Sequence, residues 1–167
     1  MDFFETVERR QSVRAFASTP LPEQQLQAIL EATNRAPSAG NFQSFQIYRV
    51  DDHEKRVALT AATFGQNFVV QAPVSLVFCA DPSRCEYEPG DLYALEDATI
   101  ACTFAMLAAT AVGLSTCWIG AFKPESVAEV IGAPNGQTPV AILPIGYAAE
   151  TPERTSRRQL SDLIRTV

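Results

Sequence analysis

Three arginines and a serine lie within six positions near the start of the sequence, in the stretch RRQSVRAF that spans residues 9–16. A guanidinium group donates paired hydrogen bonds from a planar fork, which suits a phosphate or a carboxylate. The whole chain carries a formal net charge of -6, so this local positive cluster needs a reason. The stretch is either an anion site or a basic helix end that complements the helix dipole.

The spacing within this stretch determines which side chains can act together. In an extended chain alternate side chains share a face, so Arg10, Ser12 and Arg14 would point together while Gln11 and Val13 point away. On a helix, Arg10 and Arg14 would align but Ser12 would face elsewhere. The extended interpretation gives two guanidinium forks and a hydroxyl, a donor set that matches a phosphate. These residues alone leave both interpretations open.

Three further segments place small, amide and aromatic residues where loops are expected: APSAGNFQ (36–43), GQNFVVQAPV (65–74) and TCWIG (116–120). In the first, small residues allow close backbone approach to a planar ligand, and Asn41 can bond an amide-like edge. In the second, Gln66 precedes an expected strand. In the third, Trp118 and Gly120 lie beside exposed backbone N–H groups at a strand end. Taken singly, each could equally be a plain loop, a surface glutamine or a core tryptophan.

Several common kinds of catalytic site find no support. The single histidine, His53, has polar neighbours and is expected at a solvated helix start, which leaves no histidine-rich metal site. The sequence contains no phosphate-binding P-loop and no GxGxxG after a strand. Glu96 and Asp97 are expected to start a helix, where acids stabilise the dipole. An enzyme with this sequence would therefore depend on a cofactor for its chemistry.

Helices and strands that alternate along the chain must position these residues. Apolar spacing and the placement of Pro and Gly predict the elements. Helices are expected over 2–10, 22–36, 52–62, 91–112 and 124–131, strands over 45–50, 74–80, 115–120 and 138–147, and a basic turn with a short amphipathic segment over 151–167. The mixture indicates an α+β, or layered α/β, domain around a small sheet.

Composition sets the class of protein. A chain of 167 residues is expected to form one domain, residues 1–167, and can bury about 68–70% of its unfolded surface. Charged residues make up only 19% of it, which favours an oligomer.

The net acidic charge argues against a nucleic acid partner. The uncharged helical stretch 98–112 is too short to span a bilayer, so no membrane association is expected. The four cysteines have no CxxC spacing, which favours reduced thiols and the cytoplasm.

Taken together and in this order, the segments resemble the FMN-dependent nitroreductase family over essentially the full length. The resemblance rests on RRQSVRAF, APSAGNFQ, the GQ…APV stretch, GLSTCWIG, LPIGY and the basic tail. It implies a nitroreductase-like fold, with a central, mainly antiparallel sheet flanked by helices. It also implies a homodimer with FMN at the subunit interface and the long, small-residue helix at the dimer core.

The resemblance further implies a division of the flavin contacts between two subunits. Arg10, Ser12 and Arg14 would hold the phosphate, ribityl or pyrimidine edges, and Gln66 would bond the polar edge of the ring. The other implied cofactor-binding residues are Pro37, Ser38, Ala39 and Asn41 from the partner subunit, Trp118, Ile119 and Gly120 along the isoalloxazine, and Arg157 or Arg158 at the phosphate.

The implied reaction is a ping-pong transfer of two electrons from NADH or NADPH through flavin to a small acceptor such as a nitroaromatic, quinone or enone. No side chain is assigned a catalytic role. Residues 81–94 are the best candidate for a segment that covers the substrate side. Specialised flavin chemistry (dehydrogenation, dehalogenation or flavin fragmentation), a non-catalytic flavin-binding protein and a plain interaction domain remain alternatives.

Overall fold

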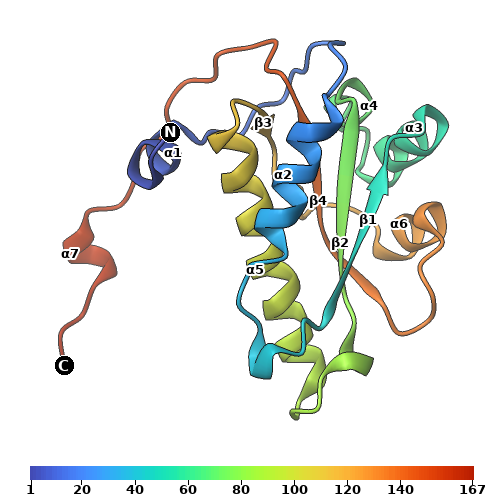
Figure 1. Ribbon diagram of the computed structural model, residues 1–167, viewed down its shortest axis with the longest axis vertical. Helices are drawn as coiled ribbons and strands as arrows, with labels where there is room; N and C mark the ends of the chain where they lie inside the picture. The colour runs from blue at the N-terminus through green and yellow to red at the C-terminus, as the bar shows by residue number, and fades with distance from the viewer.

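The computed structural model describes residues 1–167 as a three-layered arrangement around one sheet (Figure 1). All neighbouring strands in this sheet are antiparallel, in the order β1-β2-β4-β3. The strands are β1 (Phe45–Val50), β2 (Val74–Ala80), β3 (Ser115–Thr116) and β4 (Thr138–Gly146). The expected antiparallel sheet flanked by helices is thereby confirmed. The predicted strand over 115–120 is much shorter, because only its first two residues pair with β4 in a ladder.

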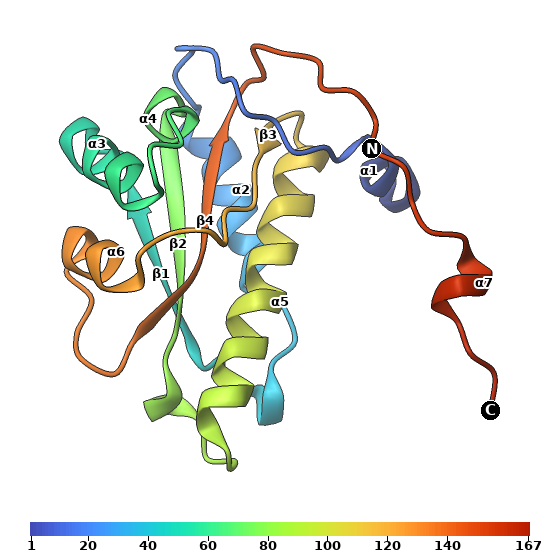
Figure 2. The ribbon, with the colours of Figure 1, turned by 180° about the vertical axis from the view of Figure 1, so that it is seen from behind.

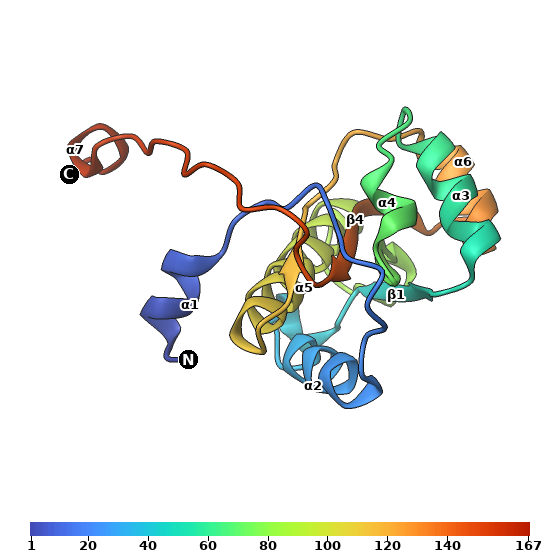
Figure 3. The same cartoon turned by 90° about the horizontal axis from the view of Figure 1, so that it is seen from above.

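Helices cover both faces of the sheet (Figures 2 and 3). One face carries α2 and α5, and the other carries α3, α4 and α6. The helices are α1 (Phe3–Arg9), α2 (Glu23–Thr33), α3 (His53–Ala62), α4 (Phe68–Gln71), α5 (Gly90–Ala111), α6 (Pro124–Ile131) and α7 (Leu160–Leu163), with 3-10 turns η1 (Ala39–Asn41) and η2 (Pro82–Arg84). The sequence did not predict the short helix α4.

The central strand β2 shows why the core has two parts. All seven of its residues are buried, because helices lie on both faces of the sheet. Successive side chains of a strand point to opposite faces. Leu76 and Phe78 therefore join the apolar cluster under α2 and α5, whereas Val77 and Cys79 join the cluster under α3, α4 and α6. The continuous apolar run in the sequence reflects this double burial.

The long helix α5 crosses one face of the sheet and ends beside β3. It stops because Gly113, two residues after its last turn, adopts a left-handed φ of 83°. By length and composition α5 could span a membrane, and it is longer than the uncharged stretch 98–112. Its Ala- and Cys-rich stripe packs on the sheet, but Leu92, Leu95 and Phe104 are exposed. An apolar helix in the fold thus keeps one face uncovered.

Candidate functional site

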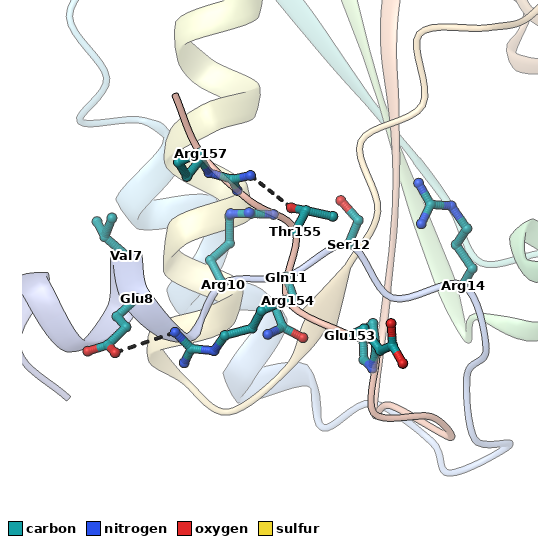
Figure 4. Close-up of a pocket in the computed structure, with 11 residues that line it drawn as sticks. Val7, Glu8, Arg10, Gln11, Ser12, Arg14, Glu153, Arg154, Thr155 and Arg157 are labelled. Carbon is teal, nitrogen blue, oxygen red and sulfur yellow. Dashed lines mark hydrogen bonds and ion pairs between the residues drawn. The ribbon is translucent and has the colours of Figure 1, made fainter. Parts of the chain in front are cut away.

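A cavity of about 550 Å³ lies where the N-terminal strand-like segment meets the C-terminal tail (Figure 4). Only one of its eleven lining residues is hydrophobic. Four arginines line it, namely Arg10, Arg14, Arg154 and Arg157. Arg154 is paired with Glu8 at 3.4 Å, whereas the other three make no ion pair. We call residues 10–14 together with 152–157 the arginine end; its uncompensated positive charge suits an anion.

The backbone of the arginine end is extended, which agrees with one of the two interpretations that the spacing left open. Ser12 forms a parallel β-bridge with Thr116, and the Val13 N–H donates to the Thr116 carbonyl at 3.0 Å. The Arg14 N–H donates to a carboxylate oxygen of Glu150. Val13 is buried in the core at 4% exposure. These contacts orient Arg10, Ser12 and Arg14 to line the cavity.

One residue at this end differs from its predicted position. Gln11 was expected to point away from the site, but it also lines the cavity. The prediction was wrong because the cavity wraps around the segment on the side of the C-terminal tail, where residues 152–157 run past it. Arg9 lies outside this cavity and pairs with Glu5 at 3.5 Å along α1.

Of the two adjacent arginines of the tail, only Arg157 lines the cavity. Arg157 lines the cavity, where its guanidinium donates to Thr155 Oγ1 at 2.8 Å. Arg158 is not among the lining residues, and it donates to the backbone carbonyl of Asp162 at 2.6 Å. Of the two residues named from the sequence, Arg157 is therefore the one that can reach an anion in the cavity.

A buried thiol lies under the arginine end. Burial raises the pKa of Cys117, and the positive charge of Arg14 opposes this rise. The negative charge of Glu150 adds to the rise, so the pKa of Cys117 stays above its usual value. Cys117 is thus a neutral thiol at physiological pH, and it packs as a small core residue.

The segment after β3 lies next to the arginine end, because Ser12 and Val13 pair with Thr116. Ile119 exchanges two backbone hydrogen bonds with Ile142, at 2.9 and 3.0 Å, which fixes the segment on β4. Gly120 is exposed at the end of this pairing, and Trp118 is partly buried against the α2–α5 cluster. The amide of Gln66 donates to the Ala121 carbonyl at 3.1 Å, so it anchors the neighbouring loop to this segment.

The loop of residues 37–44, which we call the loop end, forms a tight turn rather than a plain connection. Gly40, Asn41 and Gln43 have φ values of 54°, 58° and 51°. A Cβ on Gly40 would approach the Phe42 ring to 2.5 Å, so a larger residue there would have to displace this ring. Ser38 Oγ accepts the Gln43 N–H at 3.0 Å. Pro37 and Asn41 are exposed, whereas Ser38 and Ala39 are half-buried.

The arginine end and the loop end lie at opposite ends of α5 (Figure 1). The loop end bonds to Asp97 in the N-terminal half of α5. The arginine end lies by Thr110, near the C-terminus of α5, since Gln11 and Val13 share a smaller cavity with Thr110. Thirteen residues of helix span about 20 Å. A single subunit therefore does not bring Asn41 to the cavity that Arg10 lines.

Two site residues were not identified from the sequence. Asp97 was expected to stabilise the dipole at a helix start, but it lies in the interior of α5 and is buried. Glu150 accepts the Arg14 N–H from 136 residues away. An acid within an apolar helix stretch was a signal that could have identified Asp97, whereas no local pattern marks Glu150.

The segment between β2 and α5 lies against the loop end. Tyr87 packs edge-on against Phe42 with ring centroids 5.0 Å apart, and Tyr93 packs against Tyr87 at 5.9 Å. The stretch 81–94, expected to cover a substrate, thus adds aromatic surface beside Asn41 rather than beside the arginines.

Sequence comparisons identify the family. The model of the Nitroreductase family matches residues 7–147. The chain is 32% identical over 163 residues to "FMN reductase [NAD(P)H]" of Bacillus subtilis, an alignment that covers 87% of this chain and 66% of that protein. It is 31% identical over 143 residues to "Putative NADH dehydrogenase/NAD(P)H nitroreductase" of Archaeoglobus fulgidus, covering 83% of this chain and 80% of that one. The chain is thus markedly shorter than the Bacillus relative.

A solved structure is similar over almost the whole chain. The Vibrio harveyi NADPH:FMN oxidoreductase complexed with NAD+ superposes with a TM-score of 0.92 at 27% identity, covering 98% of this chain and 76% of that one. The match includes the sheet, both helical layers and nearly all of the remaining residues.

Proposed function

The chain belongs to the nitroreductase family, and from this premise we propose that it is an FMN-dependent oxidoreductase that passes two electrons from NADH or NADPH to a small acceptor. The observation that carries the proposal is the arginine end, where Arg10, Arg14 and Arg157 line one cavity without carboxylate partners. The relatives named for FMN reduction and nitroreduction support the same activity.

The donor set of the arginine end fits the phosphate of FMN. Guanidinium forks from Arg10 and Arg157 and the Ser12 hydroxyl supply charged and neutral donors around one cavity. Arg14 lies nearer the Thr116–Gly120 segment, which suits the pyrimidine edge of the ring system. When bound, FMN supplies the hydride and electron transfer that no side chain here can perform.

The chain's own residues would bind and orient the two reactants. Gly120 lacks a side chain at the end of the Ile119–Ile142 pairing, so a flat ring can approach its backbone N–H. The loop tied by Gln66 holds this segment in place. The positive charge of Arg14 would stabilise negative charge that develops on the ring during reduction.

We further propose a homodimer in which the loop end of one subunit completes the arginine end of the other. The separation of the two ends along α5 supports this arrangement, because neither is complete alone. The uncovered apolar face of α5 and the exposed Phe3 and Phe4 of α1 offer a surface for the partner. Helix α1 and the C-terminal tail extend from the body, where they can reach a second copy (Figure 3).

A spectroscopic experiment tests the proposed function. The purified protein, reconstituted with FMN, should be yellow, and NADH or NADPH should bleach it under anaerobic conditions. A panel of nitroaromatics, quinones and enones should restore the colour. A protein that retains no FMN would overturn the proposal, and a flavoprotein that neither nucleotide bleaches would favour specialised or non-catalytic flavin binding instead.

The free thiols support a reducing compartment. The four cysteines are unpaired, and Cys79, Cys102 and Cys117 are buried. We propose that the protein works in the reducing cytoplasm, which also supplies NADH and NADPH.

A further inference from the structure

Asp97 is a buried carboxylate without a cationic partner. Its residue is 1% exposed, and it makes no ion pair. A buried charge is costly unless hydrogen bonds compensate it. Here both oxygens are used: Oδ1 accepts the Ala39 N–H at 2.9 Å, and Oδ2 accepts the Ser44 N–H at 3.1 Å. The carboxylate therefore joins the start and the finish of the loop end to one point on α5.

The loop end needs such an anchor because its backbone is strained. Asn41 and Gln43 are non-glycine residues with left-handed φ values of 58° and 51°. Such residues favour other conformations when nothing holds them. The hydrogen bond from Gln43 N–H to Ser38 Oγ closes the turn internally. Arg84 Nε of η2 also donates to the Gln43 carbonyl at 3.1 Å, and the two bonds to Asp97 tie the turn to α5.

We propose that Asp97 is a positioning residue that preshapes the loop end to contact the flavin of the partner subunit. This inference rests on the proposed function. Because Asp97 is buried, it would act through the amides of Ala39 and Ser44 rather than by touching the cofactor. Because α5 also carries the uncovered apolar face, the same helix that would meet the partner holds the loop that would complete the partner's site. Preorganisation of this kind strengthens binding by lowering the ordering cost.

The substitution Asp97→Asn tests the role with little change in shape. An asparagine retains one acceptor oxygen, but its NH₂ group meets the second amide N–H, so one anchor is lost. We expect the FMN dissociation constant, measured by flavin fluorescence, to rise about tenfold. The matched control is Glu54→Gln, which removes the same charge from an exposed residue of α3, on the opposite side of the sheet from α5, and should change FMN affinity by no more than about twofold.

Two further measurements separate positioning from general stability. Val77→Ala in the core should lower the melting temperature as much as Asp97→Asn or more, yet leave FMN affinity near that of the wild type. In the wild-type protein, hydrogen exchange at the Ala39 amide should be much slower than at Gly40, which makes no bond to Asp97. This exchange measurement needs no variant, so it also applies if Asp97→Asn fails to fold.

The outcomes distinguish this inference from the proposed function. A wild-type protein that binds no FMN would overturn the proposed function. If the wild type binds FMN and Asp97→Asn binds it equally well, or if Val77→Ala weakens binding to the same degree, the positioning role of Asp97 would be wrong and the proposed function would stand. An Ala39 amide that exchanges as fast as Gly40 would likewise overturn the role.

Discussion

The two ends of α5 differ in what they contribute to the proposed site. The arginine end supplies charge: its backbone is extended, and three guanidinium groups there have no carboxylate partner. The loop end supplies shape, through a tight turn with left-handed residues that is held by the buried Asp97. Because one subunit holds these two features apart, the contrast supports the proposed arrangement, in which a second subunit completes the site.

The largest expected effect comes from the arginine end. Replacement of both Arg10 and Arg14 by alanine removes two charged donors, each contributing about 1.5–3 kcal/mol to binding. We expect FMN affinity to fall by about 10²–10⁴-fold, measured by fluorescence titration of the apoprotein. Arg9→Ala serves as the control, because Arg9 lies outside the cavity and pairs with Glu5. Unchanged flavin affinity in the double variant would show that these arginines do not bind FMN.

The next effect tests whether α5 brings the ends of two subunits together. Phe104 is 37% exposed on α5, and Phe104→Glu would bury an unpaired charge in the proposed interface at a cost of about 3–5 kcal/mol. We expect a monomer in light scattering, with FMN lost in parallel. The control is Val57→Glu, since Val57 is 49% exposed on α3, on the opposite side of the sheet. A Phe104→Glu protein that stays dimeric would place the interface elsewhere.

A smaller effect separates the two tail arginines. Arg157→Ala should weaken FMN binding about tenfold, because one charged donor leaves the cavity. Arg158→Ala should leave FMN affinity unchanged, because its guanidinium bonds to the Asp162 carbonyl instead. The reverse result would show that the tail is shifted by one residue in the FMN complex.

The smallest expected effect is on the free energy of unfolding. It arises from Cys79 in strand β2, between the two ends, and appears only at alkaline pH. Burial raises the pKa of Cys79 to about 12, above the value of about 8.5 for an unfolded thiol. Above pH ~8.5 the unfolded chain therefore releases a proton that the folded chain keeps, so the free energy of unfolding falls as pH rises. Urea unfolding of wild type and Cys79→Ala between pH 8 and 10 should show a shallower fall for the variant. Identical slopes would contradict the burial of this thiol.

The sequence predicted the arginine end better than the loop end. Alternation along residues 10–14 described the extended conformation as one of two open interpretations, because strand periodicity is a local property. The buried runs also predicted β2 and β4, since double burial leaves a continuous apolar sequence. Gln11 was misplaced because the tail that bounds the cavity arrives from more than 130 residues away.

The sequence predicted where the loop end lies but not its conformation. Its small residues marked a loop, but the left-handed φ of Gln43 has no local signature. The role of Asp97 depends on contacts across more than 50 residues, and dipole stabilisation at a helix start was the nearer explanation. The sequence also could not show that the arginine end and the loop end lie apart. Their separation along α5 becomes evident only in the folded chain.

Complementation between two variants tests most directly whether each site combines two subunits. One protomer would carry Arg10→Ala and Arg14→Ala, and the other Asn41→Glu, with different affinity tags to isolate the heterodimer. If each site joins the arginine end of one subunit to the loop end of the other, one site of the heterodimer is intact. It should then bind one FMN per two chains with wild-type affinity. A heterodimer with no site of wild-type affinity would contradict the shared site, because each subunit would then supply both ends itself.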